Sequence, residues 1–222
     1  VDMSGNVLLA FIANTPTGDH VVANLVTPQG TLLWGDGIQL TSGSDYYAAP
    51  VAAVFAGNCY TVAWISSSVS VMQRLDATGA PLWGDGVTLT DPGGGTLMVT
   101  DMKGTEDGCV ILDFVQYITF TGAKHLFAQK IDASGDPVWD DDPVPVFDSG
   151  SLQFGNFPDF TSDGTGGAVF SWYDTSSGLQ CSVQHIAANG TEVFPHNGVV
   201  VSTNASQQRT SPTAFFNPTA GD

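Results

Sequence analysis

Apolar residues along the chain gather in four short segments that share one layout. The segments are NVLLAFIA from Asn6, CYTVAWIS from Cys59, CVILDFVQ from Cys109 and GAVFSWYD from Gly167. Each segment is mostly apolar and carries an aromatic residue at its sixth position. Apolar runs of this length, bounded by Gly, Asn and Asp, are typical of buried strands, and no window has a convincing helical period. The pattern therefore predicts an all-β chain.

A second segment follows each apolar strand and repeats more closely. The copies read NLVTPQGTLLWGDG, QRLDATGAPLWGDG, QKIDASGDPVWDDD and QHIAANGTEVFPHN. They share an amide at the first place, a glycine at the seventh and an aromatic residue at the eleventh, namely Trp34, Trp83, Trp139 and Phe194. These aromatic residues lie 49, 56 and 55 residues apart. Self-similarity at such a period indicates a propeller or another repeat array.

A third kind of segment, small and tolerant of proline, precedes each apolar strand, as in YAAPVAAVFAGN. Each unit then contains four antiparallel strands, and the repeats span approximately 1–46, 47–95, 96–155 and 156–209 of one domain, residues 1–222. The chain begins at the second strand of a unit and ends with a lone first strand, Ser211 to Phe216, within a closing segment 210–222. We therefore expect a β-propeller of four blades, closed by pairing of the N- and C-terminal strands.

The closely repeated segment resembles the Q-(K/R)-(L/I)-D-x-x-G-x-x-x-W-G-x-x-G repeats of propellers in secreted and surface proteins of bacteria. QRLDATGAPLWGDG is the copy most similar to that pattern, and the resemblance covers nearly the whole chain. It implies a propeller fold in a secreted or cell-surface bacterial protein, and it specifies no activity. The fourth copy departs from the pattern, with Phe194-Pro195-His196 in place of Trp-Gly-Asp.

The charge of the chain limits its partners. Its 222 residues include 22 Asp and Glu against 5 Lys and Arg, a formal net charge of −17. Such a chain repels phosphate backbones and anionic lipid, which argues against nucleic acid as a partner. No run of about 20 apolar residues is present, so we expect no membrane insertion. A monomer or a homodimer is compatible with these features.

Three cysteines are too few to pair completely within the chain. Cys59 and Cys109 begin equivalent strands in successive repeats, and Cys181 is the third. Because strands of neighbouring blades diverge at this point, we expect buried thiols that behave as small apolar groups.

The repeated positions suggest structural roles before functional ones. An aromatic residue that recurs once per blade is expected to fill the space between blades, because a ring of exposed Trp would be a large apolar liability. Trp34, Trp83 and Trp139 are therefore predicted to be buried between blades. Arg74, Lys130 and His185 share another repeat position, which we expect to face outward, with His185 a surface histidine.

Acidic turns are the candidate metal site. Gly-Asp-Gly follows Trp34 and Trp83, and Asp140, Asp141 and Asp142 form the densest acidic cluster, beside Trp139. If equivalent turns met around a common axis, their oxygens could share a calcium ion, which prefers several oxygen ligands. The alternative is ordinary turn chemistry in solvent.

No motif of a nucleophilic, metal-dependent or cofactor-dependent enzyme is recognisable in the sequence, so no catalytic or cofactor-binding residue is assigned. The sequence is best interpreted as a non-enzymatic extracellular binding or scaffold module with a protein or glycan ligand. The alternative is a glycan-acting hydrolase with its site at the mouth of the propeller channel, and a third possibility is a structural domain stabilised by a cation. Function in a propeller is carried by loops and channel mouth, so the fold permits all three.

Overall fold

The computed structural model describes residues 1–222 except 42–46, 55–59, 154, 156, 203 and 218–222. Within the described residues every regular element is a strand, and the strands form four antiparallel sheets. The all-β prediction is therefore confirmed.

Each sheet is built from strands that follow one another in the sequence. The first sheet contains β1 (Val7–Thr15), β2 (Gly18–Val26) and β3 (Ile38–Gln39). The second contains β4 (Tyr47–Val54), β5 (Tyr60–Ser66), β6 (Val69–Leu75) and β7 (Val87–Leu89). The third contains β8 (Thr96–Gly104), β9 (Val110–Tyr117), β10 (His125–Ile131) and β11 (Val144–Phe147). The fourth contains β12 (Asp159–Ser162), β13 (Ala168–Tyr173), β14 (Cys181–Ile186) and β15 (Val199–Val200).

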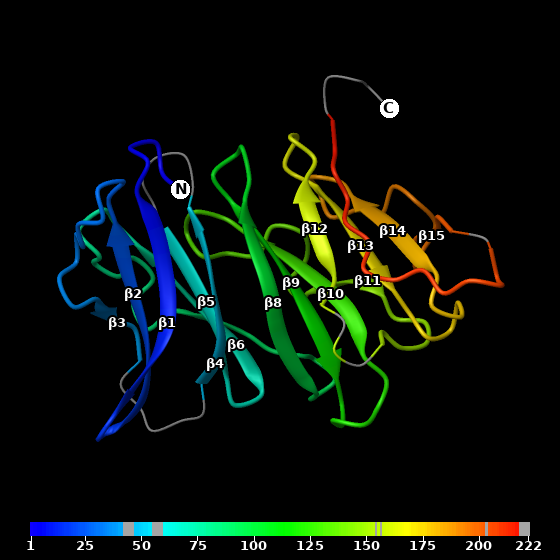
Figure 1. Ribbon diagram of the computed structural model, residues 1–222, viewed down its shortest axis with the longest axis horizontal. Helices are drawn as coiled ribbons and strands as arrows, with labels where there is room; N and C mark the ends of the chain where they lie inside the picture. Colours follow the sequence, from blue (N-terminus) through cyan, green and yellow to red (C-terminus); the bar gives the residue numbers. More distant parts are fainter. Residues whose placement is uncertain (42–46, 55–59, 154, 156, 203, 218–222) are drawn as a thin grey trace.

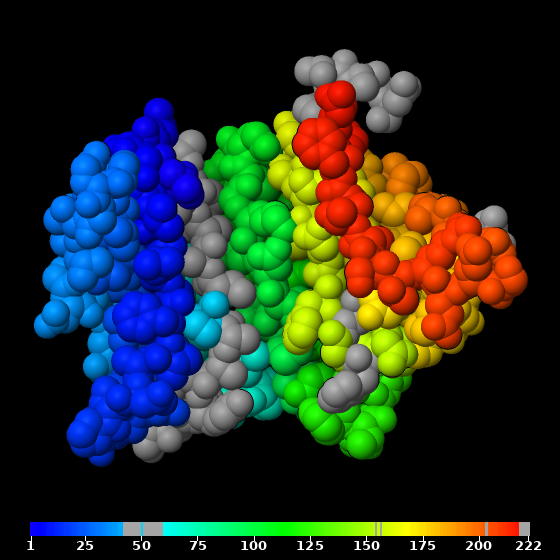
Figure 2. Space-filling model, in the orientation of Figure 1, coloured from blue at the N-terminus to red at the C-terminus, as the bar shows by residue number. Residues whose placement is uncertain are grey.

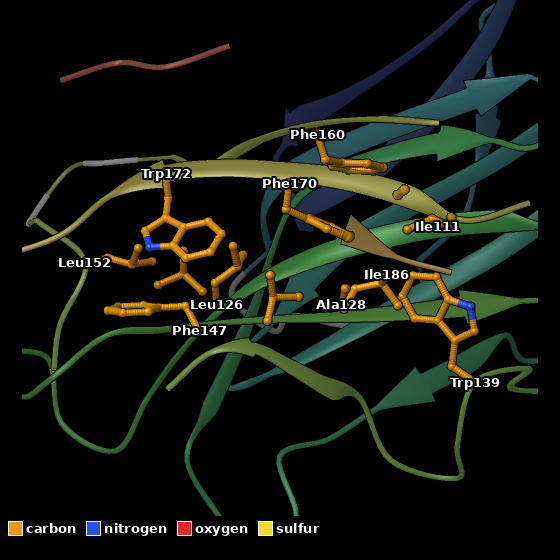
Figure 3. Packing of buried hydrophobic residues seen from close by; sticks show 13 residues of the cluster. Ile111, Leu126, Ala128, Trp139, Phe147, Leu152, Phe160, Phe170, Trp172 and Ile186 are labelled. Carbon is orange, nitrogen blue, oxygen red and sulfur yellow. The ribbon is translucent and has the colours of Figure 1, made fainter. Parts of the chain in front are cut away.

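The sheets stand side by side in chain order, from the blue first sheet to the yellow and orange fourth sheet (Figure 1). Consecutive inner strands contact one another from β1 through β4 and β8 to β12, whereas β3, β7, β11 and β15 lie at the outer edge of each sheet. The core fills the spaces between consecutive sheets as three apolar clusters. Figure 3 shows the cluster between the third and fourth sheets, where the rings of Phe147 and Trp172 have centroids 5.4 Å apart.

The expected four-blade closure is wrong for this structure. Residues 211–217 form no strand, and β1 pairs with β2 alone among the described strands. The C-terminal segment lies instead against the fourth sheet, where Thr213 Oγ1 donates to Asp159 Oδ2 over 2.7 Å. The first and fourth sheets are at opposite ends of the array, so this contact keeps the segment away from β1 (Figures 1 and 2). The four sheets form an open, propeller-like array.

The repeated Trp residues join consecutive sheets, as the sequence predicts. Trp34 Nε1 donates to Ala77 O over 3.1 Å, Trp83 Nε1 to Ala133 O over 3.1 Å, and Trp139 Nε1 to Ala188 O over 3.2 Å. Each acceptor belongs to a turn of the next sheet, and we call this contact the indole bridge. Trp34 and Trp139 are buried, while Trp83 is half-buried against the core.

The repeated glycine completes the indole bridge. Gly79, Gly135 and Gly190 have φ of +84°, +96° and +83°, a conformation that other residues rarely adopt. A Cβ added at any of them would come within 3.3 Å of the Trp side chain of the preceding sheet. Backbone conformation and the close indole contact therefore both require glycine here.

The repeated amide fixes the turn that carries the Trp. In the second sheet, Gln73 Nε2 donates to Gly84 O over 2.9 Å, and Gln73 Oε1 accepts from Trp83 N over 3.0 Å. Asn24 and Gln184 make both equivalent bonds in the first and fourth sheets, and Gln129 Nε2 donates to Asp140 O in the third. Because these backbone groups are partly buried, the amide supplies partners that solvent cannot.

The outward placement expected for the basic repeat position is wrong. Arg74 and Lys130 are buried, and His185 is half-buried. Lys130 Nζ donates to Gly166 O of the fourth sheet over 2.7 Å and pairs with Asp107 Oδ2 at 2.5 Å. His185 Nε2 lies 2.9 Å from Asp163 Oδ2. The repeated segment that carries this position does not indicate these partners, because they lie in the turns between β8 and β9 and between β12 and β13.

The prediction of a buried, unpaired thiol is confirmed for Cys109, which the structure describes. Cys109 is buried and forms no disulfide, and burial raises the pKa of its thiol to about 11. Cys181 is half-buried and also free of a disulfide. Cys59 lies outside the described residues.

Candidate functional site

The acidic turns do not converge. Asp36 and Asp85 precede the outer strands β3 and β7, and Asp140 to Asp142 precede β11. The strands that contact one another from sheet to sheet are the inner ones, so the expected ring of equivalent turns around a common axis is wrong.

Asp140, Asp141 and Asp142 are exposed and arranged as a turn. Asp140 Oδ1 accepts from Asp141 N over 2.7 Å, and the Asp140 carbonyl accepts from Gln129 Nε2 over 2.7 Å. Across the described ranges of the chain, no three His, Cys, Asp or Glu side chains are grouped so that they could hold a metal ion. Calcium binding by these three aspartates stays a prediction.

Functional groups gather instead between the inner strands of the third and fourth sheets. We call this place the β8–β12 seam. It is defined by Asp101 and Lys103 on β8, Phe157 just before β12, Asp159 at the start of β12, the neighbouring Tyr117 and Phe120, and the buried Asp113 of β9, which is bonded to β8. The side chains of Leu97, Val99 and Met102 pack in the cluster with the second sheet, which leaves Asp101 and Lys103 to face β12, while Met98 packs against the clusters on both sides. The seam therefore presents one edge of the third sheet to one edge of the fourth.

A β-bulge sets the direction of the β8 side chains. The register of β8 with β9 shifts between Val99 and Asp101, which leaves Thr100 as the extra residue. Asp113 on β9 stabilises this bulge, since its Oδ1 accepts from Thr100 Oγ1 over 2.7 Å and from Asp101 N over 2.6 Å. Asp101 and Lys103 share a face because they are two residues apart, and the extra residue turns that face away from the side of Val99, towards the side of Met98.

Asp113 is the most perturbed acid of the seam. Its side chain is completely buried, and its Oδ2 has no hydrogen-bond partner among the residues that the structure describes. Burial raises the pKa of the carboxyl to about 8, and the nearby charge of Asp101 adds to this, against the hydrogen bond from Thr100. Asp113 is therefore largely protonated at neutral pH.

The charged end of the seam is shared by both sheets. Lys103 Nζ forms ion pairs with Asp101 on its own strand and with Asp159 Oδ1 at 3.5 Å on β12. The three side chains are between 35% and 41% exposed, so a ligand can reach them. Lys103 Nζ also lies 4.2 Å from the centroid of the Phe160 ring, which holds the ammonium against the fourth sheet.

The other end of the seam is an aromatic pocket of about 250 Å³. Met98, Val115, Tyr117, Phe120, Lys124, Gly155 and Phe157 line it. Phe120 and Phe157 are 67% and 65% exposed, an unusual state for large apolar rings. Met98 and Asp101 are three residues apart on β8, about 10 Å along a strand. Pocket and charged groups thus form one continuous strip.

This arrangement is suited to binding a ligand with apolar faces and polar edges. Exposed rings can pack on apolar C–H faces, while the carboxylates accept from hydroxyls and the ammonium donates to oxygen. Proton transfer to a ligand needs a side chain within hydrogen-bond reach. The buried carboxyl of Asp113 has no such access in this structure.

One feature of the sequence does indicate this site, and it is found by aligning the four apolar segments, not from composition or motifs. The fifth residues of the four aligned apolar segments are Ala10, Ala63, Asp113 and Ser171. A carboxyl group within an otherwise apolar strand is costly unless it is hydrogen-bonded, so Asp113 distinguishes the third of the four apolar strands from the others. Asp101 and Asp159 could not be paired by sequence, because their meeting depends on how the sheets pack.

No protein family model matches the sequence, and no curated protein matches it significantly. Among solved structures, the Hadza microbial sialidase Hz136 is similar over 88% of this chain and 45% of its own, with a TM-score of 0.53 and 13% identity. An endo-arabinase from Bacteroides thetaiotaomicron VPI-5482 is similar over 86% and 70% of the two chains, with a TM-score of 0.42 and 12% identity. An alpha-L-arabinofuranosidase from Podospora anserina is similar over 85% and 63%, with a TM-score of 0.43 and 14% identity.

The sialidase likeness shows the fold alone, an array of antiparallel sheets of the propeller kind. The chain spans less than half the length of that sialidase. Within the described residues there is also no helix that is long and apolar enough to span a membrane.

Proposed function

We propose that this chain is a non-enzymatic glycan-binding module of a secreted or cell-surface bacterial protein, and that the β8–β12 seam is its binding site. The observation that carries the proposal is the continuous strip formed by two exposed phenylalanine rings and a half-exposed carboxylate–ammonium group. Sugar rings have apolar faces and hydroxyl edges, which match such a strip. A structural neighbour that is a sialidase supports a glycan as the ligand class.

The burial of Asp113 favours binding over catalysis. A glycoside hydrolase needs a protonated carboxyl beside the leaving oxygen and a second carboxylate on the substrate. Asp113 is the seam acid with a raised pKa, yet its side chain is completely buried. Its bonds to Thr100 and Asp101 assign it to the bulge that shapes the strip.

A glycan-acting hydrolase is the second candidate, and one observation favours it. Asp101 and Asp159 belong to neighbouring inner strands, and both contact the Nζ atom of Lys103. Glycoside hydrolysis requires two accessible carboxyl groups near each other.

A screen of immobilised oligosaccharides tests the proposal. We expect the wild-type chain to bind a subset of glycans, and Phe157→Ala to reduce that binding about tenfold or more. Phe215→Ala is the matched control, since Phe215 is an exposed ring outside the seam. Incubation of each bound glycan with the chain, followed by product analysis, separates the two candidates. If the wild-type chain releases sugar from a bound glycan and Asp159→Asn does not, the hydrolase is the correct candidate.

A further inference from the structure

Every interface between consecutive sheets has the same two halves. The later sheet contributes alternate residues of the apolar strand that is second in the sheet. In the second sheet these include Val62 and Trp64 of β5, which are buried against the first sheet. The earlier sheet contributes the residue just before the repeated amide, which is Ala23, Met72 or Ala128, and all three are buried. The indole bridge then ties the earlier sheet to a glycine turn of the later one.

The first sheet displays the later half without a partner. Val7, Leu9 and Phe11 of β1 occupy the repeat positions of Tyr60, Val62 and Trp64, which are nearly fully buried. On β1 the same positions are 40%, 49% and 41% exposed. Gly30 stands where Gly79, Gly135 and Gly190 touch a Trp, and no atom of the described residues lies within 4 Å of a Cβ built on it.

The fourth sheet displays the earlier half. Val183 precedes the amide Gln184, and Phe194 stands at the Trp position and is 37% exposed. With Val169, His185, Val193, Phe215 and Phe216 these residues line a cavity of about 530 Å³. Phe216 covers part of this face, with its ring centroid 5.7 Å from that of His185, while Phe215 is 88% exposed.

We propose that two copies of this chain associate head to tail, so that the face around Val183 and Phe194 in one copy packs on Val7, Leu9 and Phe11 of the other. The chain carries both halves of an interface that it uses three times internally. A second copy therefore offers a surface that continues an established packing arrangement. Because Phe194 stands at the Trp position and has no indole N–H, the fourth sheet cannot form an indole bridge to the Gly30 turn. Apolar packing is therefore the main attraction.

The position of residues 211–216 agrees with this association. Thr213 contacts Asp159 of β12, as Lys103 of β8 does from the other side. The segment thus lies where the inner strand of a following sheet would stand, and its Pro212 matches Pro50 in the aligned inner-strand segment. Head-to-tail docking would bring β1 of the other copy, whose inner edge has no described strand partner, to this segment.

Sedimentation equilibrium of the full chain, its variants and their mixtures tests the proposal. Leu9→Lys and Val193→Lys each damage one half of the interface at a partly exposed position, so both should fold, as circular dichroism would verify. Each should weaken self-association about tenfold or more. Leu82→Lys is the matched control, because Leu82 and Leu9 are both 49% exposed. Since the chain has a net charge of −17, an added lysine lowers general repulsion, and lost association reports lost apolar contact.

A mixture of Leu9→Lys and Val193→Lys should associate again, because each variant retains the half that the other has lost. A symmetric face-to-face contact would not be restored by mixing, and that result would overturn the head-to-tail arrangement. A wild-type chain that stays monomeric at all concentrations, or association that both variants leave unchanged, would also overturn the proposal. If Leu9→Lys fails to fold, Val7→Lys at the same face takes its place.

Discussion

The indole Nε1 of Trp139 donates a hydrogen bond to the carbonyl oxygen of Ala188, 49 residues further along the chain, over 3.2 Å. The bond crosses from the third sheet to a turn of the fourth, and the side chain of Trp139 also lies against Gly190 of that turn. The repeated Trp is therefore a joint between sheets.

Truncation of this joint should lower stability and spare ligand binding. We expect Trp139→Ala to reduce the free energy of unfolding by about 3–5 kcal/mol, as for other large buried aromatic residues. Trp139→Phe keeps most of the apolar contact and loses the hydrogen bond, so it should cost about 1 kcal/mol. Urea unfolding measures both. A Trp139→Ala chain with an unchanged unfolding midpoint would contradict the structural role.

Asp113 predicts a distinct pH dependence of stability. Its pKa is about 8 in the folded chain, above the ordinary value of 3.8. Because the folded state holds the proton more tightly, the contribution of Asp113 is fully present below pH 3.8 and is lost as pH rises through about 8. The melting temperature of the wild type, measured relative to Asp113→Asn, should therefore fall with rising pH across this window. A constant difference would show that Asp113 does not titrate there.

The pair of Lys130 and Asp107 predicts the opposite trend in acid. Burial alone would raise the pKa of Asp107, but hydrogen bonds from Lys130, Thr105 and Cys109 and the charge of Lys130 lower it to about 2. The stabilising contribution is therefore present above pH 3.8 and disappears as pH falls through about 2. Asp107→Asn should cost about 1–3 kcal/mol at neutral pH, since it removes a partner of a buried ammonium while Asp107 itself is partly screened by solvent.

Acid titration of unfolding checks this pair, with Asp85→Asn as a control at an exposed turn. The wild type and Asp107→Asn should converge towards pH 2, whereas Asp85→Asn should follow the wild type throughout. Equal stability of all three chains at neutral pH would reject the role of the pair.

The acidic turn at Asp140 to Asp142 predicts a response to ionic strength. The three side chains are exposed, and Asp140 caps its own turn. We expect sodium and calcium at matched ionic strength to raise the melting temperature equally, because screening relieves the repulsion of a chain at −17. A rise specific to calcium that a chelator reverses, and that Asn at the three positions abolishes, would instead establish a calcium site.

The sequence predicted what is local and repeated. Strand type, the roles of Trp34 and Trp139, and the buried thiol of Cys109 follow from spacing and apolar pattern within single units. The closure of the array and the outward placement of Lys130 were predicted wrongly, because both depend on where distant segments pack. The terminal segment bonds to Asp159 through Thr213, a contact between residues 54 apart that no repeat pattern encodes.

The candidate site was accessible to sequence reasoning only in part. Asp113 interrupts an apolar strand and could have been selected by comparing the four aligned segments. Asp101, Lys103 and Asp159 meet through a bulge in β8 and the packing of two sheets, and neither is visible in the spacing of these residues.

The binding of one glycan, measured by titration calorimetry on the wild type and Phe157→Ala, tests the central claim most directly. The ligand is the tightest hit of an oligosaccharide screen, and Phe215→Ala serves as the control ring. The account predicts saturable binding by the wild type and the control, an affinity loss of about tenfold or more in Phe157→Ala, and an intact glycan at the end. Equal affinity of the wild type and Phe157→Ala would contradict the assignment of the β8–β12 seam, and a cleaved glycan would contradict a non-enzymatic module.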